Sequence, residues 1–236
     1  MRTLRLSHWI ASTLILLPAI LCAQNRAART SSAELRLHVQ PTPATHLKVA
    51  AVVWLEPLGD TLVLPFTPQG HYTLLQKNRT FMPHLQVVPV GSVVQFPNAD
   101  PFFHNVFSLF DGKRFDLGLY EAGSTKSVTF SRSGVSYIFC NIHPEMSAVV
   151  ISLSTPLYAI ADAANNFTVR NVPPGDYAMH LWVEGALPPA LQGLSREIKV
   201  SPGMNDLGNI SIPIATNAAH TNKFGGTYDR KPTTSY

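Results

Sequence analysis

Short runs in which apolar and polar residues alternate recur along this chain, and Pro or Gly residues separate them. Residues 135–140 alternate clearly, and residues 92–96 and 147–153 are similar apolar runs. A period of two is typical of β-strands. No long segment has the period of an amphipathic helix. The pattern therefore predicts an all-β protein built from sandwiches.

A second group of strands is predicted downstream, over residues 166–184. Two strand-like runs there are joined by Pro-Pro-Gly at 173–175, and alternate residues from Tyr177 to Val183 share one apolar face. Residues 34–39 and 47–55 have the same character but lie far upstream. The chain is therefore expected to contain two sandwiches.

Composition permits two such units. The chain has 236 residues, of which 45% are hydrophobic and 14% charged, with 19 Pro and 14 Gly. This length is sufficient for two small domains. The formal net charge is +4, and Arg2 and Arg5 near the N-terminus contribute part of it. The remaining charge is too small to indicate binding to nucleic acid or to a membrane surface.

The N-terminus predicts export. Arg2 and Arg5 precede an apolar stretch that ends at Ala23, as in a secretory signal peptide over residues 1–23. We expect no membrane span after its removal, and a location in the bacterial periplasm. Lipidation at Cys22 is not expected, because the preceding Leu21 is bulky.

The candidate chemistry lies in a Cys-x2-His-x2-Met cluster, Cys140, His143 and Met146, together with the upstream His104. One thiolate, two imidazoles and a weak thioether are the ligands of a blue-copper electron-transfer site. The cluster falls in the short loop between two predicted strands. Without the leader, Cys140 is the only cysteine, and bonding to a metal would protect it in an oxidising compartment.

Other interpretations explain less. Zinc prefers four strong ligands, and Met is a poor one. A catalytic Cys–His pair lacks an orienting third group and leaves Met146 unexplained. No enzymatic constellation is evident elsewhere, so we expect no enzyme. The remaining histidines lie in no ligand spacing and are expected to be surface or packing residues: His38, His46, His71, His84, His180 and His220.

Residues 72–154 resemble a cupredoxin, and amicyanin in particular. Amicyanin has the same ligand spacing, with a Pro directly after the His of the loop, as Pro144 follows His143 here. His104-Asn105-Val106 resembles the His-Asn-Val sequence that carries the first ligand in these families. The resemblance implies one type 1 copper ion, with equatorial His104, Cys140 and His143, axial Met146, and support from Asn105 and Pro144. Asn141-Ile142 departs from the Thr-Pro frequent in these families, so the hydrogen bonding near the Cys140 sulfur is open.

Residues 156–213 resemble carboxypeptidase-regulatory-like domains, which are small immunoglobulin-like sandwiches. The likeness rests on Phe167-x-Val-x-x-Val-Pro-Pro-Gly-x-Tyr177. The upstream strands either belong to this sandwich, with the cupredoxin inserted into it, or extend the cupredoxin. The expected division is a signal peptide (1–23), a flexible leader (24–32), N-terminal strands (33–70), a Greek-key cupredoxin (71–154), the second sandwich (155–213) and a disordered tail (214–236).

The resemblance implies a periplasmic one-electron carrier that exchanges electrons with redox proteins of unknown identity. A copper-binding, storage or delivery protein with the same ligands is the alternative, and a structural module with a vestigial site is a third. Chains of this kind resemble proteins labelled methylamine-utilisation proteins. No nucleic-acid partner is expected.

Overall fold

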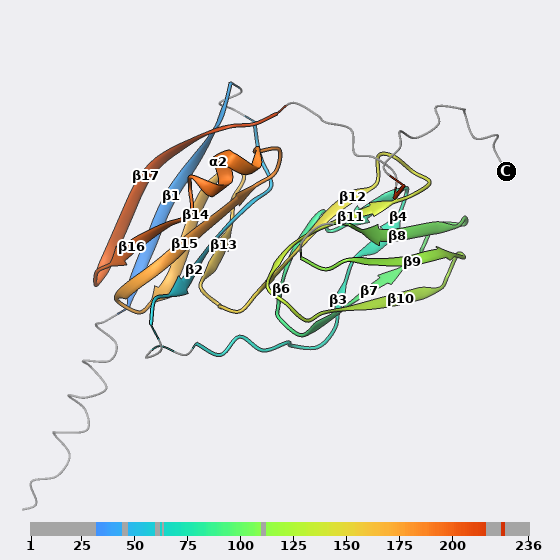
Figure 1. Ribbon diagram of the computed structural model, residues 1–236, viewed down its shortest axis with the longest axis horizontal. Coiled ribbons are helices and arrows are strands. Elements are labelled where there is room, and N and C mark those ends of the chain that lie inside the picture. The colour runs from blue at the N-terminus through green and yellow to red at the C-terminus, as the bar shows by residue number, and fades with distance from the viewer. Residues whose placement is uncertain are drawn as a thin grey trace, which may run out of the picture.

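The computed structural model describes residues 32–43, 47–59, 62, 64–109, 112–215 and 223–224. They form β-sandwiches that lie side by side (Figure 1), so the predicted all-β class is confirmed. The helix α2 (Pro188–Gln192) is short, and no helix within the described ranges is long and apolar enough to cross a membrane. The predicted signal peptide and most of the leader and tail lie outside the described residues.

One sandwich combines strands from both ends of the chain. A three-stranded sheet, β14-β1-β17, packs on a four-stranded sheet, β13-β2-β15-β16. Both early strands pair with strands that follow the predicted copper unit, which favours insertion over extension. The strands are β1 (Ala33–Thr42), β2 (Ala51–Pro57), β13 (Tyr158–Ile160), β14 (Asn166–Val172), β15 (Gly175–Val183), β16 (Arg196–Val200) and β17 (Gly203–Pro213).

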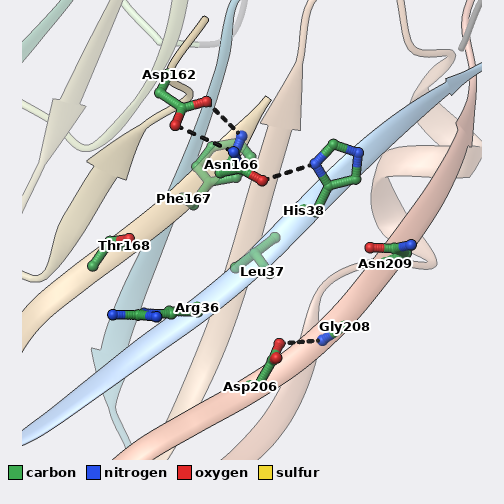
Figure 2. Close-up of a pocket in the computed structure, with 10 residues that line it drawn as sticks. All are labelled: Arg36, Leu37, His38, Asp162, Asn166, Phe167, Thr168, Asp206, Gly208 and Asn209. Atoms are coloured by element: carbon green, nitrogen blue, oxygen red, sulfur yellow. Dashed lines mark hydrogen bonds between the residues drawn. The ribbon is translucent and has the colours of Figure 1, made fainter. Parts of the chain in front are cut away.

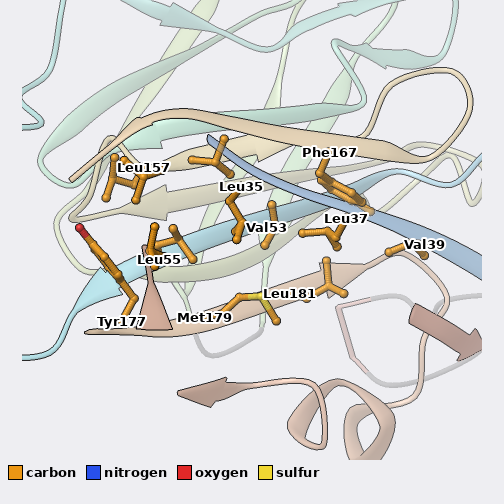
Figure 3. Close-up of a cluster of buried hydrophobic side chains, with 14 of the residues drawn as sticks. Leu35, Leu37, Val39, Val53, Leu55, Leu157, Phe167, Tyr177, Met179 and Leu181 are labelled. Atoms are coloured by element: carbon orange, nitrogen blue, oxygen red, sulfur yellow. The ribbon is translucent and has the colours of Figure 1, made fainter. Parts of the chain in front are cut away.

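The core of this sandwich follows from strict alternation. Leu35, Leu37 and Val39 project from β1 toward the side chains of β2 and β15 (Figure 3). The predicted apolar face from Tyr177 to Val183 is buried there. The strand predicted over 47–55 begins only at Ala51, because the Val49 N–H donates to Asn165 Oδ1 rather than to a strand partner.

The other sandwich holds the predicted ligands. Its five-stranded sheet has the order β6-β12-β11-β8-β9, and β10-β7-β3 forms the other sheet beside the hairpin β4-β5. Phe96, Phe130, Ile138 and Val150 are fully buried in its core. The strands are β3 (Tyr72–Thr73), β4 (Leu75–Lys77), β5 (Thr80–Met82), β6 (Leu85–Pro89), β7 (Ser92–Pro97), β8 (His104–Ser108), β9 (Phe115–Tyr120), β10 (Thr125–Phe130), β11 (Gly134–Cys140) and β12 (Ser147–Leu153).

A separate apolar cluster joins the two sandwiches. Val52 of β2 and Trp182 of β15 pack with Val149 and Ile151 of β12. The indole Nε1–H of Trp182 donates to the Tyr137 hydroxyl at 3.0 Å. Since β12 also borders the predicted ligand loop, the second sandwich packs directly against the strand that leaves that loop.

Candidate metal centre

The ligand loop spans residues 141–146, between two paired strands. β11 and β12 run antiparallel, with Phe139 opposite Ser147, so the ends of the loop are held together. Within the loop, the Met146 N–H donates to the His143 carbonyl at 3.1 Å, and the Cys140 N–H donates to the Met146 carbonyl at 3.2 Å. These bonds curl the loop back onto itself.

The neighbouring strand supplies the remaining predicted ligand. β8 pairs with β11, with Val106 opposite Cys140, and His104 is the first residue of β8. The Cys140 Sγ lies 3.7 Å from His104 Nδ1 and 3.5 Å from His143 Nδ1, and the two Nδ1 atoms are 3.1 Å apart. Three of the four predicted ligand residues therefore bring donor atoms to one point.

These separations suit one metal ion. Metal–ligand bonds of about 2.0–2.3 Å place neighbouring ligand atoms roughly 3–4 Å apart. A thiolate with two imidazoles is the equatorial set of a type 1 copper site. Met146 is fully buried in the same apolar cluster as Cys140, and its backbone is bonded to both loop ligands. The donor set and its spacing therefore fit copper.

A buried carboxylate orients His104. The Nε2 of His104 lies 2.9 Å from Asp100 Oδ2, and both side chains are almost completely buried. When Nε2 donates this bond, Nδ1 of the neutral ring is left as the acceptor that faces Cys140. Sequence reasoning missed Asp100. Its position four residues before His104 was the only signal, and a single acid is too common for that spacing to be recognised.

Asp100 is itself held by a tight turn. Asn78 and Arg79 link β4 to β5 with φ values of 55° each, as in a type I′ hairpin turn. Their backbone N–H groups donate to the two Asp100 oxygens at 2.6 and 3.0 Å. Burial raises the pKa of Asp100, but the hydrogen bonds from Arg79, His104 and Asn78 outweigh it and leave the pKa below its ordinary value. The carboxylate is therefore charged at neutral pH.

The ligand pKa values follow from burial. Burial lowers the pKa of His104, against the opposing effect of Asp100, and lowers that of His143, with a further contribution from His104. Both rings are therefore neutral at pH 7, as metal ligands must be. Burial raises the pKa of the Cys140 thiol, although backbone N–H groups of Asn105, Ile142 and His143 hydrogen-bond to its sulfur and lower it. A metal bound by Cys140 would have to displace this thiol proton.

The site has one accessible edge. His104 and Cys140 are fully buried, whereas His143 is partly exposed. The Phe102 ring lies 5.3 Å from the His104 ring and 5.5 Å from the His143 ring. Ile142 is exposed beside His143, and Phe103 is exposed next to Phe102. Apolar side chains thus lie next to His143, which is the one predicted ligand that reaches solvent.

The two predicted supporting residues differ in what they contact. Asn105 reaches the Cys140 sulfur through its backbone N–H, while its side chain donates to Asp116 on β9 at 2.7 Å. Pro144 is exposed and follows His143 directly, where it limits the conformations of the loop. Asn105 therefore reaches the Cys140 sulfur through its backbone N–H and not through its side-chain amide, which bonds to Asp116 instead.

A pocket of about 390 Å³ lies on the other sandwich, over β1, β14 and β17 (Figure 2). Its polar side chains bond mainly to one another. Asn166 donates to Asp162 at 3.3 Å and lies 3.0 Å from His38 Nδ1, and the Gly208 N–H donates to Asp206. None of the four predicted ligands lines it. We assign no chemistry to this pocket.

No protein-family model and no curated protein matches this chain. Among solved structures it is similar to a copper-containing nitrite reductase from Thermus scotoductus (23% identity, TM-score 0.34), covering 42% of this chain and 25% of that one. It is also similar to a purple cupredoxin from Nitrosopumilus maritimus (23% identity, TM-score 0.32) and to amicyanin from Paracoccus versutus (21% identity, TM-score 0.33). These matches cover 36% and 37% of this chain, and 100% and 85% of the others.

The chain thus spans only about a quarter of the nitrite reductase. Because these TM-scores and identities are low, the interpretation of the site rests on the geometry of its own side chains. The likeness of the second sandwich to carboxypeptidase-regulatory-like domains, and the methylamine-utilisation label, stay predictions. The pairing of β8 with β11 and of β11 with β12 brings the predicted ligands His104, Cys140 and His143 together within the β-sandwich formed by β3–β12.

Proposed function

We propose that this chain is a one-electron carrier that binds a single type 1 copper ion. His104, Cys140 and His143 are the equatorial ligands, and Met146 is the weak axial ligand. The proposal is supported above all by the donor atoms of the first three residues, which lie within 4.8 Å of one another. Copper bound there would supply the Cu(I)/Cu(II) couple.

The residues around the site limit its rearrangement. Asp100 fixes the His104 ring, and strand pairing at Cys140 fixes the start of the loop. A carrier benefits from ligands that keep one geometry in both oxidation states, because rearrangement slows electron transfer. The partly exposed edge of His143, beside Ile142, is the proposed path for electrons. Small apolar surfaces are sufficient for brief encounters with redox partners.

Copper storage or delivery is less well supported. A delivery site must release its metal to an acceptor, so its ligands must be reachable. Here His104 and Cys140 are fully buried, and only His143 of the three is partly exposed. Export to the periplasm and interaction with redox proteins are part of the proposal, and they rest on the predicted leader and on the accessible edge.

Protein-film voltammetry combined with a chelator tests this function. A carrier gives a reversible one-electron couple, and the reduced protein loses its copper only slowly when a Cu(I) chelator is added. Rapid transfer of copper to the chelator upon reduction would instead support delivery. The Ile142→Lys variant adds a matched test, because it should slow electron exchange with redox proteins while the visible spectrum stays unchanged.

A further inference from the structure

A chain of polar contacts connects the two segments that carry the ligands. Asn105, next to His104, donates through Nδ2 to Asp116 Oδ1 at 2.7 Å. The Nζ of Lys223 donates to the other oxygen of Asp116 at 2.8 Å. The backbone N–H of Lys223 donates to Oδ1 of Asn141, next to Cys140, at 3.0 Å. Lys223 thus completes a bridge from one ligand segment to the other.

The local structure of β9 presents Asp116 for this role. The pairing of β8 with β9 shifts register between Asn105 and Phe107, and Gly118 has a φ of 64°, which is typical of a bulge. The Gly118 N–H donates to the same Asp116 oxygen as Asn105, at 2.9 Å. Burial raises the pKa of Asp116, but the bonds from Lys223, Asn105 and Gly118 lower it overall. The carboxylate is therefore available to both neighbours.

Asn141 is the residue at which the ligand loop departs from the Thr of similar families. The Asn141 side chain accepts a hydrogen bond from the backbone N–H of Lys223, which lies 82 positions away in the chain. The residue that differs from the Thr is therefore the one that contacts this distant segment. The Lys223 side chain is one quarter exposed and that of Asp116 is 41% exposed. The bridge is therefore partly shielded from solvent, and its effect should be moderate.

We infer that Lys223 is a positioning residue of the copper site, which restrains the ligand loop by joining Asp116 to Asn141. The inference rests on the proposed copper-binding function, but the restraint of the loop by Lys223 does not depend on the metal. Without Lys223, the loop that carries His143 and Met146 has one tether fewer. The ligands should then move more freely, and copper should leave faster.

The test compares Lys223→Met with Lys199→Met. Lys199 also pairs with a carboxylate, at 3.9 Å, but on the other sandwich. We expect Lys223→Met to speed the transfer of Cu(I) to a chelator by about two- to fivefold, the size of an exposed ion pair, and Lys199→Met to leave the rate unchanged. Asn141→Ala, which removes the other end of the bridge, should act in the same direction as Lys223→Met.

Hydrogen exchange of the copper-free protein separates this inference from the proposed function. Amides of residues 140–146 should exchange faster in Lys223→Met than in the wild type or in Lys199→Met. If Lys223→Met exchanges faster but the wild type binds no copper, the role of Lys223 as a tether of the loop is supported. The proposed function as an electron carrier is then rejected. Equal exchange and equal copper loss in both lysine variants would overturn the role of Lys223.

Discussion

At the residue scale, the site depends on a contact between two buried side chains, Asp100 and His104. A carboxylate in contact with a ligand imidazole increases the basicity of that ligand and fixes its orientation. Its negative charge also stabilises the more positive oxidation state of a metal nearby. Asp100 should therefore influence the reduction potential as well as the geometry.

We predict that Asp100→Asn raises the reduction potential of the bound copper by about 50–100 mV, because a unit charge a few Å from the metal is removed. Voltammetry measures the shift directly. Asp176→Asn is the matched control, since it removes the same charge on the other sandwich, from a carboxylate that pairs with Lys199. A potential equal to that of the control would show that the Asp100 charge does not reach the metal.

Met146 tests the axial position. Because a type 1 axial bond is long and weak, Met146→Leu should keep copper bound and should raise the potential. Leu fills a similar volume, which limits the disturbance of the buried cluster around Met146. Copper content and potential of the purified variant are the measurements. Loss of copper from this variant would mean that the thioether is a strong ligand, and delivery would gain support.

At the element scale, alternation predicted the strands on both sides of the ligand loop, and the structure has them as β11 and β12. The alternation of apolar and polar residues in each strand and the short loop between the two strands are local signals, so they can be recognised directly in the sequence. The bulge at Gly118 and the contacts of Lys223 with Asp116 and Asn141 could not be predicted in this way. They depend on which distant strands become neighbours, and no local pattern records that.

A histidine links the ligand loop to the other sandwich. His84 Nε2 lies 2.7 Å from Glu184 Oε1, and Nδ1 lies 3.1 Å from the carbonyl of Ser147, at the end of the loop. The hydrogen bond to Glu184 raises the pKa of His84 above its ordinary value of 6.5, although burial opposes the effect. This residue was expected to have only a surface or packing role.

We predict that this contact weakens as pH rises. A raised histidine pKa gives stability that is fully present below pH 6.5 and is lost as pH rises through the pKa of the folded state. His84→Gln should therefore lower the free energy of unfolding by at most about 1 kcal/mol at pH 5.5, and by less at pH 8.5. Thermal unfolding at both values is the measurement. A difference independent of pH, or one equal to that of His38→Gln, would contradict the assignment.

At the scale of the whole molecule, each sandwich has its own apolar core, and a third cluster joins them. The composition predicted two units, and the upstream runs left two topologies open. The pairing of β1 with β14 and β17 favours the insertion, but no feature of residues 33–42 alone could identify those partners. Pairing between strands more than a hundred residues apart is a property of the complete fold.

The copper-free protein should remain folded. Its cores contain many fully buried apolar side chains, so four metal contacts are a small part of its stability. If copper binds the folded protein more tightly than the unfolded chain, its removal should lower the melting temperature by linkage without unfolding the chain at room temperature. Circular dichroism before and after chelation measures this. A random-coil spectrum after chelation would show that the metal is required for folding, as in small zinc domains.

The visible absorption spectrum of the copper-loaded protein tests the central claim most directly. If Cys140 binds copper as an equatorial thiolate, the wild type should show an intense thiolate-to-copper charge-transfer band when oxidised, and the band should disappear on reduction. Cys140→Ser should lack this band even when copper is present. A wild type without the band, or a Cys140→Ser variant that keeps it, would contradict the assignment of a type 1 copper site.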